Sequence, residues 1–343
     1  MQIKPPTVTI KKFHKALQTV RQFFQSRTAL MSKLLYGFAI VFVLLNIVAY
    51  FHAYKFTHFT QSNIAKTKDP ARLSGFDKIK IALFGIDNPR PRTQTTPKQP
   101  FATVRIQSGQ TALECWHITV AKPKGTVILF HGYSAEKSQM LERSDELLHM
   151  GYNTILVDFM GCGGSSGNET TIGFHETENV KACFNHLKQQ GEERIFLFGS
   201  SLGAAAVIKA VSEGDIMPSG IIVECPFGSM LDAARMRFTA MKLPSFPMAE
   251  LLVFWGGVQH GFWGFAHKPT EYAQSVHTPT LLLWGGKDDK VSREEIGAIF
   301  HNLSSPKRLV VYPRAGHAGY LADYREQWKS DVRSFLESGF RAE

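Results

Sequence analysis

The hexapeptide Phe-Gly-Ser-Ser-Leu-Gly at residues 198–203 constrains the fold of this chain more than any other stretch. A short apolar run at 194–198 leads into it and a run of helix formers at 204–211 follows, so Ser201 is expected at a sharp turn from a strand into a helix. The glycines at 199 and 203 provide the space that such a turn needs. This pattern is typical of a nucleophile elbow, which exposes a serine hydroxyl at the N-terminus of a helix.

Length and charge distribution indicate a folded protein whose positive charge is confined to its N-terminal segment. The chain has 343 residues, of which 44% are hydrophobic, enough for a large folded core. Its net charge of +10 arises at one end, because residues 1–68 contain ten Lys or Arg and no Asp or Glu. The rest of the chain holds 29 basic and 29 acidic side chains and is neutral overall. We therefore expect no nucleic-acid partner for the body of the protein.

An apolar run at residues 34–51 follows the basic N-terminal segment. These residues would form a helix roughly 27 Å long, just enough to cross the hydrocarbon layer. Tyr36, Tyr50 and Tyr54 are placed for the two membrane interfaces. We therefore predict a basic cytoplasmic arm at 1–33 and a single transmembrane helix at 34–54. The positive flank predicts that the C-terminal body lies outside the cytoplasm, in the periplasm or the extracellular space.

Three other interpretations of this segment stay open. One is a cleaved signal peptide, which usually has a shorter basic region and a small-x-small cleavage site after the apolar run. Here the basic region is long, and no such site ends the run. An organelle transit sequence is also free of acidic residues, but Lys exceeds Arg in residues 1–33. A buried core helix is the fourth interpretation, although the ionisable groups nearby all lie outside the run.

Residues 55–100 are polar and end in a stretch, 88–100, with four prolines in thirteen residues. This composition predicts a semi-extended linker. Within it, residues 73–86 have the pattern of a short amphipathic helix, which would rest on the membrane or on the folded body.

From residue 101 onward, apolar runs alternate with helical patterns. Strands are expected at 126–130, 153–157, 194–198, 220–223, 280–284 and 308–312. Helices are expected at 138–150, 175–190, 204–211 and 320–337. Such alternation predicts an α/β fold with a doubly wound, mostly parallel sheet in a single domain at 101–343.

Two further motifs stand at strand ends, His-Gly-Tyr-Ser at 131–134 and Asp-Phe-Met-Gly-Cys-Gly-Gly-Ser-Ser-Gly at 158–167. Together with the Ser201 motif they resemble the α/β-hydrolase superfamily, in its serine esterase, lipase and aminopeptidase-like branch, over about 101–340. The resemblance implies that the backbone N–H groups of Tyr133 and Leu202 form the oxyanion hole. Met160 stands where this branch usually has Arg, a departure that affects loop packing. His131, in the strand-end turn, is expected to be structural.

The resemblance also implies a cap insertion at about 226–278. This stretch is rich in aromatic residues and Met, which form either an acyl-binding wall or the small core of the cap itself. Glycines at 256, 257, 261 and 264 suggest a bent or mobile segment in place of one long helix.

The remaining partners of the serine follow the last two expected strands. Residues 285–291 are similar to the Gly-x-x-Asp-x-x-Val loop of the family, which puts Asp288 in the position of the catalytic acid. Asp289 is the fallback, and Glu224, at another strand end, is a weaker candidate. The Gly-His step at 316–317 is like the loop that bears the catalytic histidine, which would be His317. The chain order Ser, Asp, His is the order of this fold.

This set predicts acyl transfer to water, because a serine hydroxyl needs a base and the base needs an orienting carboxylate. We expect no cofactor and no metal: no nucleotide fingerprint follows another strand, and the four cysteines lack metal-binding spacing. The preferred function is a membrane-anchored serine hydrolase that cleaves small-molecule or lipid carboxylic esters. A serine aminopeptidase or thioesterase is the alternative, and a non-catalytic binding module the second. The oligomeric state is left open.

Overall fold

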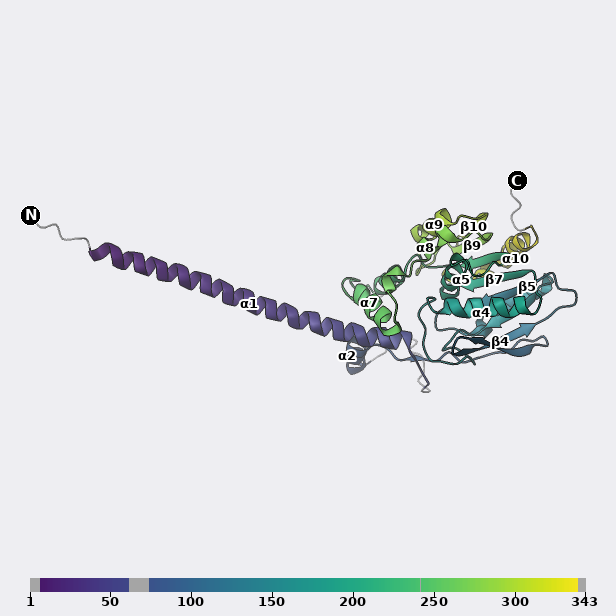
Figure 1. Ribbon diagram of the computed structural model, residues 1–343, viewed down its shortest axis with the longest axis horizontal. Helices are drawn as coiled ribbons and strands as arrows, with labels where there is room; N and C mark the ends of the chain where they lie inside the picture. Colours follow the sequence, from purple (N-terminus) through teal and green to yellow (C-terminus); the bar gives the residue numbers. More distant parts are fainter. Residues whose placement is uncertain (1–6, 62–73, 241, 339–343) are drawn as a thin grey trace, which may run out of the picture. The chain divides into compact units, whose positions relative to one another are not determined.

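The computed structural model describes residues 7–61, 74–240 and 242–338. Its chain divides into two compact units, Met1–Val48 and Ala49–Glu343, and each is described by itself. Helix α1 (Thr7–Thr57) begins in the first unit and ends in the second (Figure 1). The division of the chain into arm, span, linker, hydrolase domain and cap stays a prediction.

Helix α1 is the one helix in the described ranges that is long and apolar enough to cross a membrane. Its most apolar 18-residue window has a mean hydropathy of 2.3, and only 6% of that window is buried by protein. The alternative of a buried core helix therefore does not fit, because a core helix would be covered on most sides.

The second unit is built on an eight-stranded sheet with the order β10-β9-β8-β7-β5-β6-β4-β3. Strands β5 to β10 are parallel to one another, whereas β4 runs antiparallel to both β6 and β3. This confirms the predicted mostly parallel sheet. The strands are β3 (Ala102–Ser108), β4 (Thr111–Ile118), β5 (Thr126–Phe130), β6 (Asn153–Val157), β7 (Ile195–Ser200), β8 (Gly220–Glu224), β9 (Thr280–Gly285) and β10 (Lys307–Tyr312).

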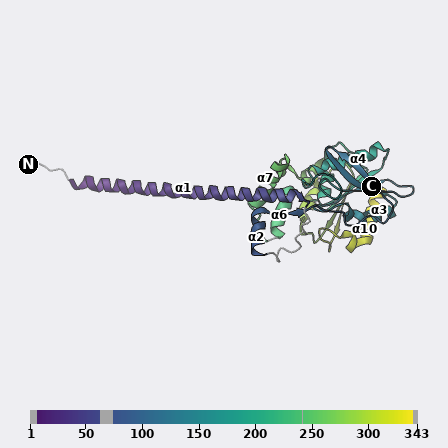
Figure 2. The same cartoon turned by 90° about the horizontal axis from the view of Figure 1, so that it is seen from below.

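Helices cover both faces of this sheet, as a doubly wound fold requires. Alternate side chains of each strand enter different cores: Leu197 of β7 packs on one face, while Phe196 and Phe198 pack on the other. Figure 2 shows α3 and α10 on the side of the sheet opposite α4. The helices are α3 (Leu141–His149) and α10 (Tyr320–Ser338) on one face, and α4 (Glu176–Gln189), α5 (Leu202–Ser212) and α9 (Arg293–Asn302) on the other.

The insertion between β8 and β9 contains α6 (Met230–Ala240), α7 (Met248–His260), η3 (Gly264–Ala266), α8 (Pro269–Tyr272) and η4 (Ala273–Ser275). The expected interruption at residues 256 and 257 is wrong, because α7 continues through both glycines and ends at His260, with Gly261 as its C-cap. At Gly257 a Cβ would lie 2.5 Å from the carbonyl oxygen of Phe262, so the missing side chain lets the chain fold back closely after the helix.

The end of α1 packs into the second unit. Ala49, Ala53 and Thr57, spaced by four residues, are all buried, and Tyr50 lies edge-on against Trp255 of α7 at 5.4 Å. The following strand β1 (Phe59–Thr60) pairs in parallel with β2 (Asn88–Pro89), so both ends of the expected linker are held on the folded body.

A short helix, α2 (Gly75–Phe84), lies where residues 73–86 predicted one, and Ser74 caps its N-terminus. Phe76 and Ile79 on this helix are exposed. The 62–73 part of the expected linker is outside the described residues.

Candidate active site

Ser201 stands at the turn between β7 and α5. Its φ of 53° lies in the left-handed region, which a residue with a side chain adopts only where the surroundings enforce it. At Gly199 a Cβ would lie 2.4 Å from the carbonyl oxygen of Gly203, and at Gly203 a Cβ would lie 2.4 Å from that of Phe130. Both glycines are therefore required by close backbone contacts, as the sequence predicted.

The structure brings Ser201, His317 and Asp288 together. His317 Nε2 lies 3.0 Å from Ser201 Oγ, and His317 Nδ1 lies 2.9 and 3.0 Å from the two carboxylate oxygens of Asp288. The side chain of Asp288 is fully buried, and its Oδ1 accepts hydrogen bonds from the N–H groups of Lys290 and Val291. These bonds fix the orientation of the carboxylate in the loop.

The sheet explains this convergence. Asp288 follows β9, Ser201 follows β7 and His317 follows β10, and the carboxyl ends of parallel strands open on the same edge. The two other candidate acids lie elsewhere. Asp289 is exposed, and the buried Glu224 carboxylate is engaged by Arg143 and by the indole N–H of Trp328.

The two N–H groups expected to form an oxyanion hole lie beside the serine. A Cβ on Gly132 would contact the Cβ of Ser201 at 3.5 Å, so the turn that carries Tyr133 packs directly on the elbow. Leu202 is the first residue of α5. Among the described residues, neither the Tyr133 nor the Leu202 N–H donates a hydrogen bond to another group of the chain. Both are therefore available to a ligand atom.

His131 is buried away from the serine and has a structural role. Its Nδ1 lies 2.8 Å from the carbonyl oxygen of Gly132, and its Nε2 accepts from the N–H of Phe159. Burial lowers the pKa of His131, which favours the neutral ring.

Asp158 organises the glycine-rich loop after β6. Its carboxylate accepts from the backbone of Lys137 and Gly164 and pairs with the fully buried ammonium group of Lys137. Met160 occupies the position where related sequences have Arg. The guanidinium of Arg90, which follows β2, donates to loop carbonyl groups at residues 163, 165 and 167.

Cys225 is a site residue that sequence reasoning missed. It follows β8, and its sulfur donates to the carbonyl oxygen of His317 at 3.1 Å and lies 3.9 Å from His317 Nε2. Burial by itself lowers the pKa of His317, but the Cys225 sulfur and the hydrogen bond to Asp288 outweigh it and raise this pKa to about 10. The place of Cys225 at a strand end next to the elbow strand was the signal available. All four cysteines are buried free thiols.

The aromatic residues of the insertion have mixed positions. Phe262 stacks on Phe174 at 4.0 Å, and Trp255 contacts the end of α1, so these two contribute to packing. Phe246 and Trp263 are exposed. Some aromatic residues of the insertion therefore serve packing, as expected of a cap core, whereas others are exposed and do not belong to such a core.

The end of α1 also reaches the oxyanion turn. The Tyr133 hydroxyl donates to the carbonyl oxygen of Phe56, and the two rings stack at 4.6 Å. The guanidinium of Arg237, from α6, lies 3.7 Å from the centre of the Phe56 ring. The end of α1 and the insertion therefore meet at the residue that carries one of the expected oxyanion donors.

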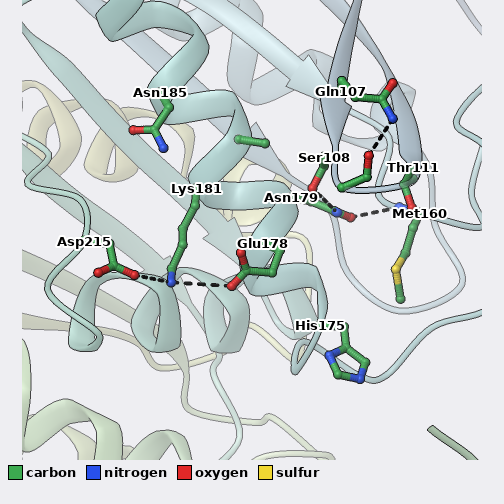
Figure 3. A pocket seen from close by; sticks show the side chains of 12 residues that line it. Gln107, Ser108, Thr111, Met160, His175, Glu178, Asn179, Lys181, Asn185 and Asp215 are labelled. Carbon is green, nitrogen blue, oxygen red and sulfur yellow. Dashed lines mark hydrogen bonds and ion pairs between the residues drawn. The ribbon is translucent and has the colours of Figure 1, made fainter. Parts of the chain in front are cut away.

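A cavity of about 590 Å³ lies apart from the serine, against α4 and the turn between β3 and β4 (Figure 3). Its lining includes His175, Asn179 and the Lys181 ammonium group, which pairs with Glu178 and Asp215. None of Ser201, His317 and Asp288 lines it, so it belongs to a different surface.

A family model described as Hydrolase_4, serine aminopeptidase S33, matches residues 121–255, a range that includes Ser201. A solved structure of the Pyrococcus furiosus esterase Pf2001 superposes with a TM-score of 0.61 at 27% identity, covering 72% of this chain and 96% of that one. The esterase EaEST from Exiguobacterium antarcticum shares the fold, with a TM-score of 0.54 at 19% identity, covering 69% and 100%.

Among relatives by sequence, protein YqkD of Bacillus subtilis is 23% identical over 227 residues, which are 65% of this chain and 74% of YqkD. Protein Rv2307c of Mycobacterium tuberculosis is 28% identical over 195 residues, 56% of this chain and 62% of that one. The lysophosphatidylserine lipase ABHD12 of Xenopus tropicalis is 24% identical over 206 residues. The match covers 56% of this chain and half of the lipase.

Fold, site geometry and these likenesses define an α/β hydrolase of the esterase and lipase-like kind. The chain belongs to the α/β-hydrolase superfamily, and its N-terminal apolar helix is consistent with membrane anchoring.

Proposed function

We propose that this chain is a serine hydrolase that cleaves carboxylic esters bearing an acyl chain, with Ser201 as nucleophile, His317 as base and Asp288 as the orienting acid. The observation that carries the proposal is the continuous contact from Ser201 Oγ through both ring nitrogens of His317 to the buried Asp288 carboxylate. A serine hydroxyl becomes a strong nucleophile only when a neighbouring base takes its proton.

The reaction would follow two balanced steps. Ser201 Oγ bonds to the ester carbonyl carbon while His317 Nε2 takes the hydroxyl proton and then delivers it to the departing alcohol. In the second step His317 Nε2 takes a proton from a water molecule whose oxygen bonds to the acyl carbon; the bond between that carbon and Ser201 Oγ breaks, His317 returns the proton to Oγ, and the carboxylic acid leaves. The N–H groups of Tyr133 and Leu202 would stabilise the oxyanion, each by about 3 kcal/mol as judged from comparable donors.

We favour an ester over an aminoacyl substrate because the acidic side chains of the insertion are already engaged by other groups of the protein. An aminopeptidase needs carboxylates that are available for the substrate amino group. Glu250 pairs with Arg235 and Glu271 pairs with Lys268, while Asp232 hydrogen-bonds Ser229. The names of the related esterase and lipase point the same way, although the matching family model is named for an aminopeptidase.

The test compares p-nitrophenyl esters of rising chain length with aminoacyl arylamides and acyl thioesters, using Ser201→Ala as the blank. The proposal predicts turnover of the esters, with kcat/KM rising by up to about fourfold for each methylene that is buried, which corresponds to about 0.8 kcal/mol. Turnover confined to the arylamides or thioesters would replace the ester assignment. A fluorophosphonate probe tests the nucleophile separately: folded protein that never reacts is a binding module, and labelling that persists in Ser201→Ala excludes this serine.

A membrane location accompanies this proposal. The basic residues that precede the apolar run favour a cytoplasmic N-terminus and a hydrolase unit outside the cytoplasm. A location beside the bilayer would give the enzyme access to lipid esters.

A further inference from the structure

A second cluster of chemically reactive side chains lies outside the catalytic site and joins three separate segments of the second unit. His58 directly follows α1 and forms an isolated antiparallel bridge with Glu169, in the loop after β6. His260 is the last residue of α7. Two imidazoles and a carboxylate therefore face one another although 202 residues separate the first from the last.

The spacing of the three groups is too wide for hydrogen bonds and suits a shared ion. His58 Nε2 lies 3.5 Å from Glu169 Oε2, and His260 Nδ1 lies 3.6 Å from the same oxygen. Hydrogen bonds between such atoms are about 2.7–3.2 Å long. Tetrahedral Zn²⁺, with bonds of about 2.0–2.2 Å, separates its ligand atoms by roughly 3.3–3.5 Å. One ligand atom from each residue lies within 4.8 Å of the others.

The tautomer of His58 directs a lone pair at the carboxylate. Its Nδ1 lies 3.0 Å from the carbonyl oxygen of Tyr54. Nδ1 also lies 3.1 Å from the hydroxyl of Thr57, which donates its own proton to the carbonyl oxygen of Ala53 at 2.9 Å. Both neighbours of Nδ1 therefore accept, so Nδ1 carries the proton, and in the neutral ring Nε2 has a lone pair. This lone pair faces Glu169 Oε2, where a bound cation would offset the repulsion between the two atoms. Such a backbone anchor on the remote nitrogen is the usual support of a metal-binding histidine.

His260 is held in a nearly dry position at the same point. Its side chain is 4% exposed and stacks on the His58 ring at 5.1 Å. Its Nδ1 faces Glu169, while its remote Nε2 is buried without a hydrogen-bond partner within the described ranges, so packing alone orients this ring. The Glu169 side chain is 46% exposed, so an ion could enter from solvent along this carboxylate.

We propose that His58, Glu169 and His260 bind a divalent transition-metal ion, with Zn²⁺ as the best match. Two imidazoles and one carboxylate form a common zinc ligand set, and a water molecule would complete the tetrahedron. The ion would tie the end of the anchor helix and the last turn of α7 to the loop after β6, and it has no part in the chemistry at Ser201.

Binding is tested on the full chain without a histidine tag, in detergent micelles, after removal of metal with a chelator. Calorimetric titration with ZnCl₂ should show one equivalent bound at this site. Glu169→Gln, which keeps the shape of an exposed side chain, should weaken binding at least about tenfold, as should His260→Gln. Cys225→Ala is the matched control, because Cys225, Asp288 and His317 form the other group able to hold an ion, and this variant should bind as the wild type does.

Thermal melting provides a second readout that also checks folding. Zn²⁺ should raise the Tm of the wild type and of Cys225→Ala, and leave that of Glu169→Gln unchanged, since a ligand stabilises only the state that binds it. Without zinc, wild type and Glu169→Gln should melt together; His58→Gln replaces any variant that does not fold. Absence of zinc uptake by folded wild type overturns the proposal. The proposal is also overturned if one equivalent of zinc still binds to both Glu169→Gln and His260→Gln, or if zinc binding is lost only in Cys225→Ala.

Discussion

The sulfur of Cys225 lies 3.9 Å from His317 Nε2, the same nitrogen that lies 3.0 Å from Ser201 Oγ. The thiol is thus a direct neighbour of the proposed base, although the two residues are 92 positions apart in sequence. The pKa of this histidine consequently depends on its burial, on the sulfur of Cys225 and on the carboxylate of Asp288.

This relationship predicts an unusual pH dependence. Burial opposes protonation of His317, but Cys225 and Asp288 raise its pKa to about 10. A general base must be neutral, so kcat/KM for a p-nitrophenyl ester should still be rising between pH 7 and about 10. Cys225→Ala removes one of the raising influences and should shift this rise to lower pH. The pH profiles of wild type and variant measure both effects; superimposable profiles, or a wild-type rise centred near 6.5, would contradict the expectation.

The raised pKa of His317 also predicts how the stability of the folded chain changes with pH. The folded-state pKa of His317 is above the ordinary value of 6.5, so protonation favours the folded chain. The stabilisation from this group is fully present below about pH 6.5 and is lost as the pH rises through about 10. Urea unfolding of wild type and Cys225→Ala across this range should show the pH-dependent loss to be smaller in the variant.

The close approach of α5 to the end of β5 predicts a specific sensitivity at the elbow. In Gly203→Ala the new Cβ would lie 2.4 Å from the carbonyl oxygen of Phe130, which is backbone and cannot move away easily. The free energy of unfolding should fall by about 1–3 kcal/mol. Gly297→Ala, inside α9, is the matched control, because its Cβ meets nothing within 4 Å and should stabilise by about 0.5–1 kcal/mol. Denaturant unfolding of both variants decides; equal midpoints would mean that the elbow tolerates a side chain.

The buried ammonium group beside the glycine-rich loop predicts a large effect of charge removal. The side chains of Lys137 and Asp158 are fully buried and paired with each other. Lys137→Met leaves a buried carboxylate without its cation and should cost about 3–5 kcal/mol. Lys124→Met removes a cation from the solvent-exposed pair with Glu337 and should change stability far less, because solvent screens that pair. Thermal melts of the two variants provide the comparison, and similar losses would contradict it.

Most of the strands that the sequence predicted are buried on both faces, because their residues are nearly all apolar; β10, at the edge of the sheet and partly exposed, is the exception. All five residues of β5 and of β6 are buried, and both strands were predicted with the observed bounds. The hairpin β3–β4 was missed: it lies at the edge, and its half-exposed residues give only an alternating pattern. Helix α9 was also missed, although Ser292 and Glu295 form a capping box.

The candidate triad could be proposed because each member follows a motif at a strand end. The neighbours of the triad could not, because their positions depend on which strands are adjacent. Cys225 reaches His317 only because β8 lies between β7 and β9. The His58, Glu169 and His260 cluster depends in the same way on how the end of α1 and helix α7 pack against the loop after β6, and none of its members stands in a recognisable motif.

The acid-free segment before the apolar run at 34–51 predicts the orientation of the chain in the membrane. Protease added to intact cells or spheroplasts should digest the hydrolase unit and leave residues 1–33 protected, because the positive flank stays in the cytoplasm. Replacing the six Lys and Arg residues between positions 11 and 33 by Gln should weaken this bias and give a mixed population. Protease added after detergent lysis is the control for intrinsic susceptibility. Removal of only the first thirty residues from intact cells would mean the opposite orientation, and recovery of a mature chain that lacks the apolar run would mean a cleaved signal peptide.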